Sequence, residues 1–203
     1  MRKALLALLL VAVLSACTSD GGARIDVRPP DVDVDTPALR EVKARIGMED
    51  CESGAGEAVE GGLPDLTLPC LGGGQAVELS SLRGPMVINL WQANCEPCRE
   101  EMPALEEFHQ QYGDRVALLG VDFNDVHPDR ALALAEETGA TYPSVADPGG
   151  ELMAEEAFAI GRRGLPAFVF VDADGTVVAQ DSGGVDSVAE IKAKVAEHLG
   201  IAL

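Results

Sequence analysis

The stretch that decides the fold is Trp91-Gln92-Ala93-Asn94-Cys95-Glu96-Pro97-Cys98. It follows an apolar run over residues 86–90, which predicts a buried strand, and it opens a run with helical spacing over residues 95–112. A helix N-terminus carries unpaired backbone N–H groups and a partial positive charge, and both favour a thiolate. Because Cys98 lies one turn after Cys95, the two sulfurs can close a disulfide. The spacing therefore predicts a centre of dithiol–disulfide exchange.

Further elements on both sides of this stretch indicate an α/β domain. Strands are predicted over residues 66–68 and 76–79 (a β-hairpin across Gly72–Gly74), 85–91, 116–123, 167–171 and 176–180. Helices are predicted over 95–112 (with Pro103 as a kink), 127–138, 151–159 and 185–199. Helices that alternate with buried strands imply a layered α/β fold, and the last hairpin makes one end of its sheet antiparallel.

The N-terminus has the pattern of a secretory signal. Residues 1–3 are basic, and residues 4–13 form an apolar run that is too short to span a bilayer as a helix. The following Leu14-Ser15-Ala16-Cys17 resembles a bacterial lipobox, in which the cysteine becomes the lipid-modified first residue. We therefore predict a signal peptide over 1–16, lipidation of Cys17 and an extracytoplasmic location on the outer face of the cytoplasmic membrane. The alternative is an ordinary signal peptide that leaves Cys17 as a spare thiol.

Residues 17–62 are predicted to be a lipid-anchored tether, and residues 63–203 to be the folded domain. Residues 18–35 are rich in Asp, Gly and Pro and show no periodic apolar face. A short helix is predicted near 37–46, because Thr36 is a suitable N-cap and a proline follows it. This helix could dock on the domain.

The net charge of −19 restricts the partners. Such acidity argues against nucleic acid and against adhesion to anionic lipid by charge, so contact with the membrane would depend on the lipid anchor. We expect a monomer.

The other cysteines predict a second bridge. If Cys17 is acylated, four cysteines remain, and four allow three pairings. Because Cys95 and Cys98 share a motif, Cys51 and Cys70 are the natural partners in a structural disulfide. The alternative is a four-cysteine zinc site, but structural zinc usually binds two close pairs, and Cys51 and Cys70 lie far apart in the chain. We expect no metal site.

With these elements in place, the chain resembles the thioredoxin superfamily, and is most similar to the membrane-tethered TlpA/ResA-like thiol–disulfide oxidoreductases. The resemblance covers about residues 63–203. It rests on WxxxCxxC at 91–98, the run 99–103, an insert around 122–148, Gly164-Leu165-Pro166 and the run 171–175. It implies a thioredoxin-like fold with a central mixed sheet flanked by helices, an N-terminal β-hairpin and a central α/β insert.

The resemblance also implies roles for residues of the site. Cys95 would be the attacking thiolate and Cys98 the resolving thiol, with Pro166 as a cis proline that faces them. The predicted neighbours are Trp91, Glu96, Pro97 and Leu165. The chain departs from the family pattern at Asn94, where an aromatic residue is common, and at Leu165, where Thr is common.

Two acidic positions bear on the chemistry of the thiols. In ResA-like proteins an acidic residue after the second main strand is a candidate proton acceptor for the resolving thiol, which favours Asp125 here, with Asp122 in reserve. The alternative for each is a loop cap or a solvated carboxylate. Glu96 lies beside Cys95 and disfavours its thiolate, whereas the helix dipole favours it. On balance we expect a reductase.

The resemblance implies no dissociable cofactor. It implies client proteins with disulfides or thiols, such as apocytochrome c CxxCH sites, and electrons from a membrane thiol carrier of the CcdA/DsbD type. One alternative is a Cu(I) metallochaperone, although SCO-type proteins usually show CxxxC and a distant His ligand. Another is a thiol peroxidase, although the Pro-x-x-x-Thr-x-x-Cys arrangement is absent.

Overall fold

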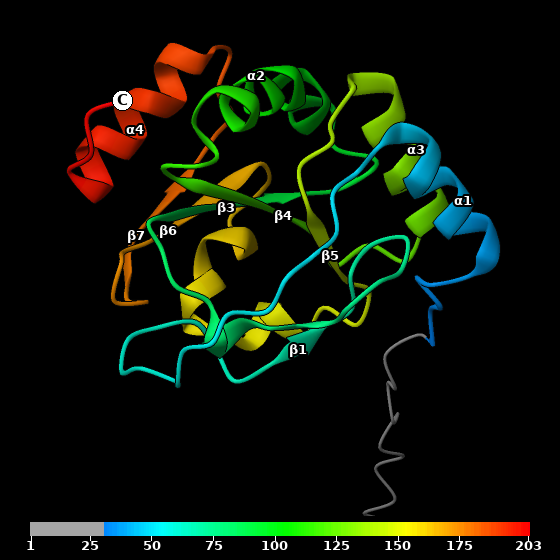
Figure 1. Ribbon diagram of the computed structural model, residues 1–203, viewed down its shortest axis with the longest axis horizontal. Helices are drawn as coiled ribbons and strands as arrows, with labels where there is room; N and C mark the ends of the chain where they lie inside the picture. The colour runs from blue at the N-terminus through cyan, green and yellow to red at the C-terminus, as the bar shows by residue number, and fades with distance from the viewer. Residues whose placement is uncertain (1–30) are drawn as a thin grey trace, which may run out of the picture.

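The computed structural model describes residues 31–203, which form an α/β domain around a five-stranded mixed sheet (Figure 1). The sheet has the order β5-β4-β3-β6-β7. Its strands are β3 (Met86–Trp91), β4 (Ala117–Phe123), β5 (Ser144–Asp147), β6 (Ala167–Val171) and β7 (Val177–Ser182). Strands β3, β4 and β5 are parallel, whereas β6 and β7 are antiparallel to their neighbours. The expected thioredoxin-like mixed sheet is confirmed.

Helices cover one face of the sheet, and shorter elements cover the other (Figure 1). The helices are α1 (Pro37–Ile46), α2 (Glu96–Tyr112), α3 (Pro128–Thr138) and α4 (Val188–Leu199). Opposite them lie the hairpin β1 (Thr67–Leu68) and β2 (Val77–Glu78), and the 3₁₀ turns η1 (Leu79–Ser81), η2 (Glu151–Ala154) and η3 (Glu156–Arg162). Each face therefore has its own apolar core, and strand β3 contributes to both.

Two elements differ from the prediction. Strand β5 was not expected, because its four residues carry one strongly β-prone side chain, Val145, and prolines flank them at Pro143 and Pro148. The helix expected over residues 151–159 is instead the pair of 3₁₀ turns η2 and η3. Glu155 between them is extended, with φ −84° and ψ 135°, and Phe158 inside η3 has φ −121° and ψ 17°, which is not helical either.

The helix expected near residues 37–46 is confirmed as α1. Oγ1 of Thr36 accepts a hydrogen bond from the Leu39 N–H at 3.3 Å, and Gly47 ends the helix at φ 75°. Buried residues in and around α1 join the helical-face core: they are Val34, Leu39 and Met48. The packed unit therefore includes residues well before the predicted boundary at Leu63.

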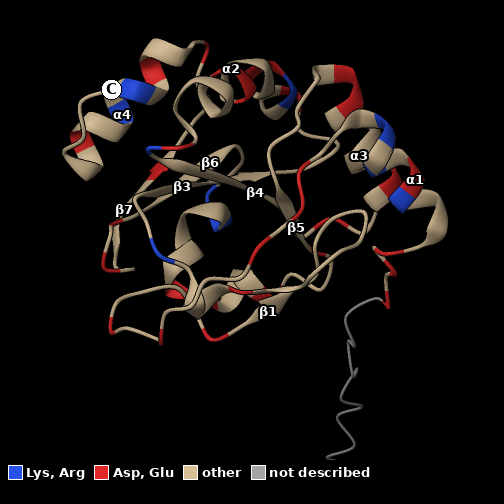
Figure 2. Ribbon diagram, in the orientation of Figure 1, with Lys and Arg blue, Asp and Glu red and all other residues tan. Residues whose placement is uncertain are grey.

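Some predictions cannot be compared with this structure. The signal peptide, Cys17 and the first part of the tether lie outside the described residues. Over residues 31–203 no helix has the length and apolar character needed to cross a bilayer. Figure 2 shows acidic residues on every helix, with basic residues interspersed among them.

Candidate active site

The CxxC motif lies at the connection between the end of strand β3 and the start of helix α2. Cys95 is the N-cap of α2, with extended backbone angles of φ −97° and ψ 103°. The Cys95 N–H donates to the carbonyl of Gln92 at 3.1 Å, which closes the turn between strand and helix. Pro97 occupies the first helical turn, where a missing N–H costs nothing because no acceptor is available there. The sequence thus places one cysteine at the tip of the helix and the other inside its first turn.

Cys95 and Cys98 form a disulfide with an S–S distance of 2.04 Å and a Cα–Cα distance of 5.2 Å. Cys95 is half-buried, whereas Cys98 is fully buried. The Cys98 N–H donates to Cys95 Sγ at 3.3 Å, so a free backbone N–H of the helix terminus points at this sulfur. An external thiol can therefore reach the sulfur of Cys95 but not that of Cys98.

Pro166 lies beside the first turn of α2. The Leu165–Pro166 peptide bond is cis, and Pro166 immediately precedes β6, the antiparallel neighbour of β3. A Cβ built on Gly184 would lie 3.5 Å from Pro166 Cγ and 3.8 Å from the carbonyl oxygen of Pro97. Leu165 is half-buried and packs against both apolar cores.

Asp125 holds the loop that precedes Cys95. Its Oδ2 accepts from the Ala93 N–H at 3.0 Å, and its Oδ1 accepts from the His127 N–H at 2.9 Å. Nearby, Gln92 Nε2 donates to the carbonyls of Phe123 and Asn124 at 3.0 and 2.8 Å. The carboxylate of Asp125 therefore fixes the backbone of the CxxC loop relative to the end of β4.

Asp122 has a different environment. It is fully buried on the helical face of β4, and among residues 31–203 neither of its carboxyl oxygens has a hydrogen-bond partner. Burial raises the pKa of Asp122 well above its usual value, and the negative charges of Asp125 and Asp147 add to the effect. The neutral acid is favoured, which makes Asp122 a poor proton acceptor for a thiol.

Glu101 is a site residue to which sequence reasoning assigned no role. It lies one turn after Cys98 on α2 and is 1% exposed. Asn89 of β3 donates from Nδ2 to Glu101 Oε1 at 2.7 Å. Burial raises the pKa of Glu101 to about 8, although the hydrogen bond from Asn89 and the charge of Lys194 oppose the shift.

The carboxyl of Glu101 also lies near Pro166. The Cβ built on Gly184 would be 3.5 Å from both Glu101 Oε2 and Pro166 Cγ. Residues three apart on a helix have Cβ atoms about 5–6 Å apart, so Glu101 is also a neighbour of Cys98. Two signals in the sequence could have revealed it: the polar Asn89 in an apolar strand, and the helical spacing of Glu101 with the buried Cys98 and Leu105.

The charges around Cys95 are paired with one another. Glu96 is exposed and forms an ion pair with Arg99 at 3.4 Å, and Arg99 also contacts Glu137. Within residues 31–203, the one hydrogen bond that Cys95 Sγ accepts comes from the backbone of Cys98. Trp91 is fully buried behind the motif, as part of the core on the helical face.

The other two cysteines of residues 31–203 form a separate bridge. Cys51 and Cys70 are joined with an S–S distance of 2.00 Å and a Cα–Cα distance of 5.7 Å. Both belong to the core on the face opposite α2, whereas Cys98 belongs to the helical-face core. The four sulfurs are thus divided between two sites, and the alternative of a four-cysteine zinc site is wrong for this structure.

Comparison with known proteins places this geometry in a family. The model of the AhpC/TSA family matches residues 59–180. The chain belongs to the AhpC/TSA family. This segment contains the CxxC motif, Asp125 and Pro166.

Two individual relatives carry names of thioredoxin-like or thiol–disulfide oxidoreductase proteins. The chain is 33% identical over 90 residues to the thioredoxin-like protein YneN of Bacillus subtilis, a match that covers 43% of this chain and 52% of that protein. It is 30% identical over 113 residues to the thiol-disulfide oxidoreductase ResA of Bacillus thuringiensis, which covers 54% of this chain and 62% of that protein. The chain thus spans between half and two thirds of the length of these relatives.

A solved structure agrees on the fold. A thioredoxin-like protein from Porphyromonas gingivalis superposes with a TM-score of 0.53 at 25% identity, covering 68% of this chain and 92% of that one. The resemblance to the TlpA/ResA-like branch of the thioredoxin superfamily is confirmed.

Proposed function

We propose that this protein is a thiol–disulfide oxidoreductase that reduces disulfides of client proteins through Cys95 and Cys98. The observation that carries the proposal is the asymmetric pair at the N-terminus of α2, in which Cys95 is half-buried and Cys98 is fully buried. An accessible sulfur can form a mixed disulfide with a large partner, and a buried sulfur beside it can then resolve the mixed disulfide.

The reaction begins from the reduced dithiol. The Cys95 thiolate attacks one sulfur of the client disulfide, and the client's other sulfur leaves as a thiolate that takes up a proton. Cys98 then loses its proton and attacks Cys95 Sγ, which releases the first client sulfur. Two electrons have passed to the client, and Cys95–Cys98 is left as the disulfide seen in the structure.

The proton of Cys98 needs an acceptor, and Glu101 fits this role. A carboxyl whose pKa is raised to about 8 binds and releases a proton near neutral pH, which is the range in which a thiol must be deprotonated. Asp125 is the acceptor that the resemblance implies, but both of its oxygens already accept backbone N–H groups.

The charge around Cys95 supports electron flow from the protein to the client. No cation contacts its sulfur within residues 31–203, and Glu96 lies next to it in the chain. The backbone N–H of Cys98 donates to this sulfur, but a thiolate that faces no cation is stabilised less than one that does. The reduced form is then less favoured, so the protein is a better reductant. A reduction potential near that of thioredoxin, about −270 mV, would support this direction, and one near that of DsbA, about −120 mV, would contradict it.

The cellular setting belongs to the same proposal. The basic and apolar residues 1–13 and the lipobox ending at Cys17 support lipid anchoring on the outer face of the cytoplasmic membrane. There a membrane thiol carrier of the CcdA/DsbD type would re-reduce Cys95–Cys98, and apocytochrome c or other secreted thiol proteins would be the clients. The protein would act as a monomer and without a dissociable cofactor.

The test is to trap a client. Cys98→Ala should leave client proteins covalently attached to Cys95, as adducts that a reductant releases. Cys95→Ala is the matched control, because it lacks the attacking sulfur and should trap nothing. If Cys98→Ala forms no adduct with any disulfide-bonded protein, the assignment of the two roles is wrong. Stoichiometric binding of Cu(I) by the reduced protein, without insulin-reducing activity, would favour the metallochaperone instead.

A further inference from the structure

The second disulfide has surroundings that a permanent crosslink does not need. Cys51 follows α1, and Cys70 follows β1 and forms an isolated antiparallel bridge with Val145 of β5. The bond therefore ties the segment after α1 to the edge of the central sheet. Both cysteines are buried, at 2% and 1% exposure.

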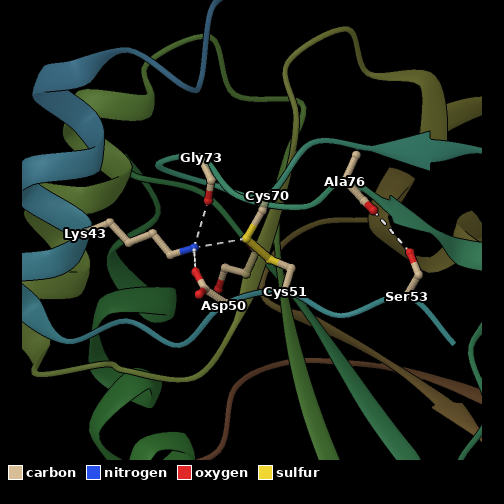
Figure 3. Close-up of a disulfide and its surroundings, with 8 residues drawn as sticks. Lys43, Asp50, Cys51, Ser53, Cys70, Gly73 and Ala76 are labelled. Atoms are coloured by element: carbon tan, nitrogen blue, oxygen red, sulfur yellow. Dashed lines mark hydrogen bonds and ion pairs between the residues drawn. A yellow bond between two sulfur atoms is a disulfide. The ribbon is translucent and has the colours of Figure 1, made fainter.

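A buried ammonium group points at one of the two sulfurs. Lys43 is 5% exposed, and its Nζ donates to Cys70 Sγ at 3.3 Å (Figure 3). The same Nζ donates to Asp50 Oδ1 at 2.9 Å and to the Gly73 carbonyl at 2.8 Å. An ammonium has three protons, so one of the three donors of this buried charge is directed at a disulfide sulfur, which is a weak acceptor. A thiolate at the same position would be a charged acceptor and would form a much stronger bond.

The other sulfur has a complementary neighbour. Cys51 Sγ lies 3.2 Å from the carbonyl oxygen of Ser144. A disulfide sulfur has no proton to donate to this oxygen, whereas a thiol does. The surroundings of both sulfurs are therefore better suited to the reduced pair than to the oxidised one: an acceptor faces Cys51, and a cation faces Cys70.

We propose that Cys51–Cys70 is a second redox-active site, which a small dithiol reduces to a Cys51 thiol and a Cys70 thiolate paired with Lys43. One thiolate of the dithiol attacks Cys51 Sγ, and the bond to Cys70 breaks, so that Cys70 leaves as the stabilised thiolate. The second sulfur of the dithiol then displaces Cys51, which takes up one proton. The dithiol becomes a disulfide, two electrons enter the protein, and one of the two dithiol protons is released to solvent.

The site also has room for a small reagent beside the ammonium. A cavity of about 720 Å³ is lined by Lys43, Asp50 and the three glycines 72–74. A Cβ built on Gly74 would lie 3.5 Å from Lys43 Nζ and from Asp50 Oδ1, and 3.9 Å from Cys70 Cβ, so any side chain at this position would occupy the space beside these groups. Neither cysteine lines this cavity, and both are buried, so the attacking group must enter past Lys43 and Asp50. A small dithiol can do so, whereas the surface of a folded protein cannot.

Because Lys43 stabilises the reduced form, it makes the bridge easier to reduce than an ordinary structural disulfide. Reduction would also remove the covalent link between the segment after α1 and the sheet edge. This site is distinct from Cys95–Cys98, and its behaviour does not depend on the function proposed for that pair.

The test compares the full chain with Lys43→Met in dithiothreitol buffers of graded redox ratio. Alkylation of free thiols followed by peptide mass spectrometry reports the reduced fraction of Cys51 and Cys70 separately from that of Cys95 and Cys98. We expect Lys43→Met to lower the equilibrium constant for reduction of Cys51–Cys70 about tenfold or more, and to leave that of Cys95–Cys98 unchanged. Circular dichroism in the same buffers shows whether the protein stays folded.

Two further variants control for charge and for folding. Arg40→Met removes a cation from the same helix that lines the same cavity but contacts Asp35 rather than sulfur, so the equilibrium should not change. Asp50→Asn removes an anion that competes for Lys43 and should raise the equilibrium constant about twofold or more. If Lys43→Met does not fold, the direction of the Asp50→Asn effect decides. The proposal is overturned if neither variant shifts the equilibrium, or if the wild-type pair is reduced only when the protein unfolds.

Discussion

The two disulfides of this protein differ in access and in charge. Cys95–Cys98 lies at a helix tip with one half-buried sulfur, and that sulfur accepts a hydrogen bond from a backbone N–H. Cys51–Cys70 joins residues 19 apart in the sequence, buries both sulfurs and has the ammonium of Lys43 against one of them. The half-buried sulfur of Cys95 allows the first pair to exchange with protein disulfides. In the second pair, the ammonium of Lys43 would stabilise a thiolate on Cys70. The contrast shows that spacing alone does not determine what a pair of cysteines can do.

The largest difference should appear in activity. Cys95→Ser should lower the rate of insulin reduction to the background, a loss of about 10³-fold or more, because the thiolate is the nucleophile and a hydroxyl cannot replace it. The double variant Cys51→Ser/Cys70→Ser should keep the rate within a factor of about three. If both variants lost insulin reduction to the same extent, the two pairs would act as one site, which would contradict the separate roles assigned to them.

The next largest effect should be a pH dependence of stability that comes from Glu101, which lies beside Cys95–Cys98 and not beside Cys51–Cys70. The folded pKa of Glu101, about 8, lies above the ordinary glutamate value of 4.5, so between these values the folded state binds a proton that the unfolded state lacks. Stability is therefore lost as the pH rises through this window, at about 1.4 kcal/mol per pH unit. Between about pH 5 and pH 8 the loss is on the order of 4 kcal/mol.

Glu101→Gln should remove most of this dependence, because the amide can still accept from Asn89 but has no proton to lose. Urea unfolding of the oxidised protein at several pH values measures the effect. Glu100→Gln is the matched control, since Glu100 is exposed and adjacent on the same helix. A wild-type stability that does not fall from pH 5 to pH 8 would show that Glu101 is ionised in the folded protein.

Loss of each bridge should affect stability differently. Removing Cys51–Cys70 as the double Ser variant should lower the free energy of unfolding by about 3 kcal/mol, because its loop is long enough to constrain the unfolded chain. Removing Cys95–Cys98 in the same way should lower the free energy of unfolding by less, because the two cysteines are only three positions apart in the sequence. Urea unfolding of the two double variants gives both values, and the reverse order would contradict the assignment of Cys51–Cys70 as the main covalent restraint.

The fold could be derived from the sequence because its signals are local. Apolar strands such as β3 and the capped helix α1 follow from periodicity and from residues such as Thr36 and Gly47. Strand β5 could not be found in this way, because it is short and its pairing with β4 comes from tertiary contacts. The packing of Val34 and Met48 against the domain is also a tertiary effect, which composition does not report.

The site could be derived only in part, for a related reason. The motif at 91–98 identifies the sulfurs, but the spacing of residues does not report which buried carboxyl lies near them. The resemblance to ResA-like proteins favours Asp125, whereas Glu101 has its raised pKa because β3 and α2 pack together around it and Asn89. Lys43 and Cys70 likewise meet only in three dimensions, across the Gly72–Gly74 turn.

The smallest effect should come from Asp125, and it tests whether this carboxylate handles a proton or holds the loop. Asp125→Asn replaces one acceptor oxygen by an NH₂ group, so one of the contacts with Ala93 and His127 is lost. We expect disulfide exchange to slow a few-fold by the same factor at every pH, because a loosened loop positions Cys95 less well without changing any titration. Asp129→Asn, in the first turn of α3, is the control for loss of charge. A shift in the pH–rate profile would instead assign Asp125 as the proton acceptor of Cys98, whereas an unchanged rate would remove Asp125 from the site.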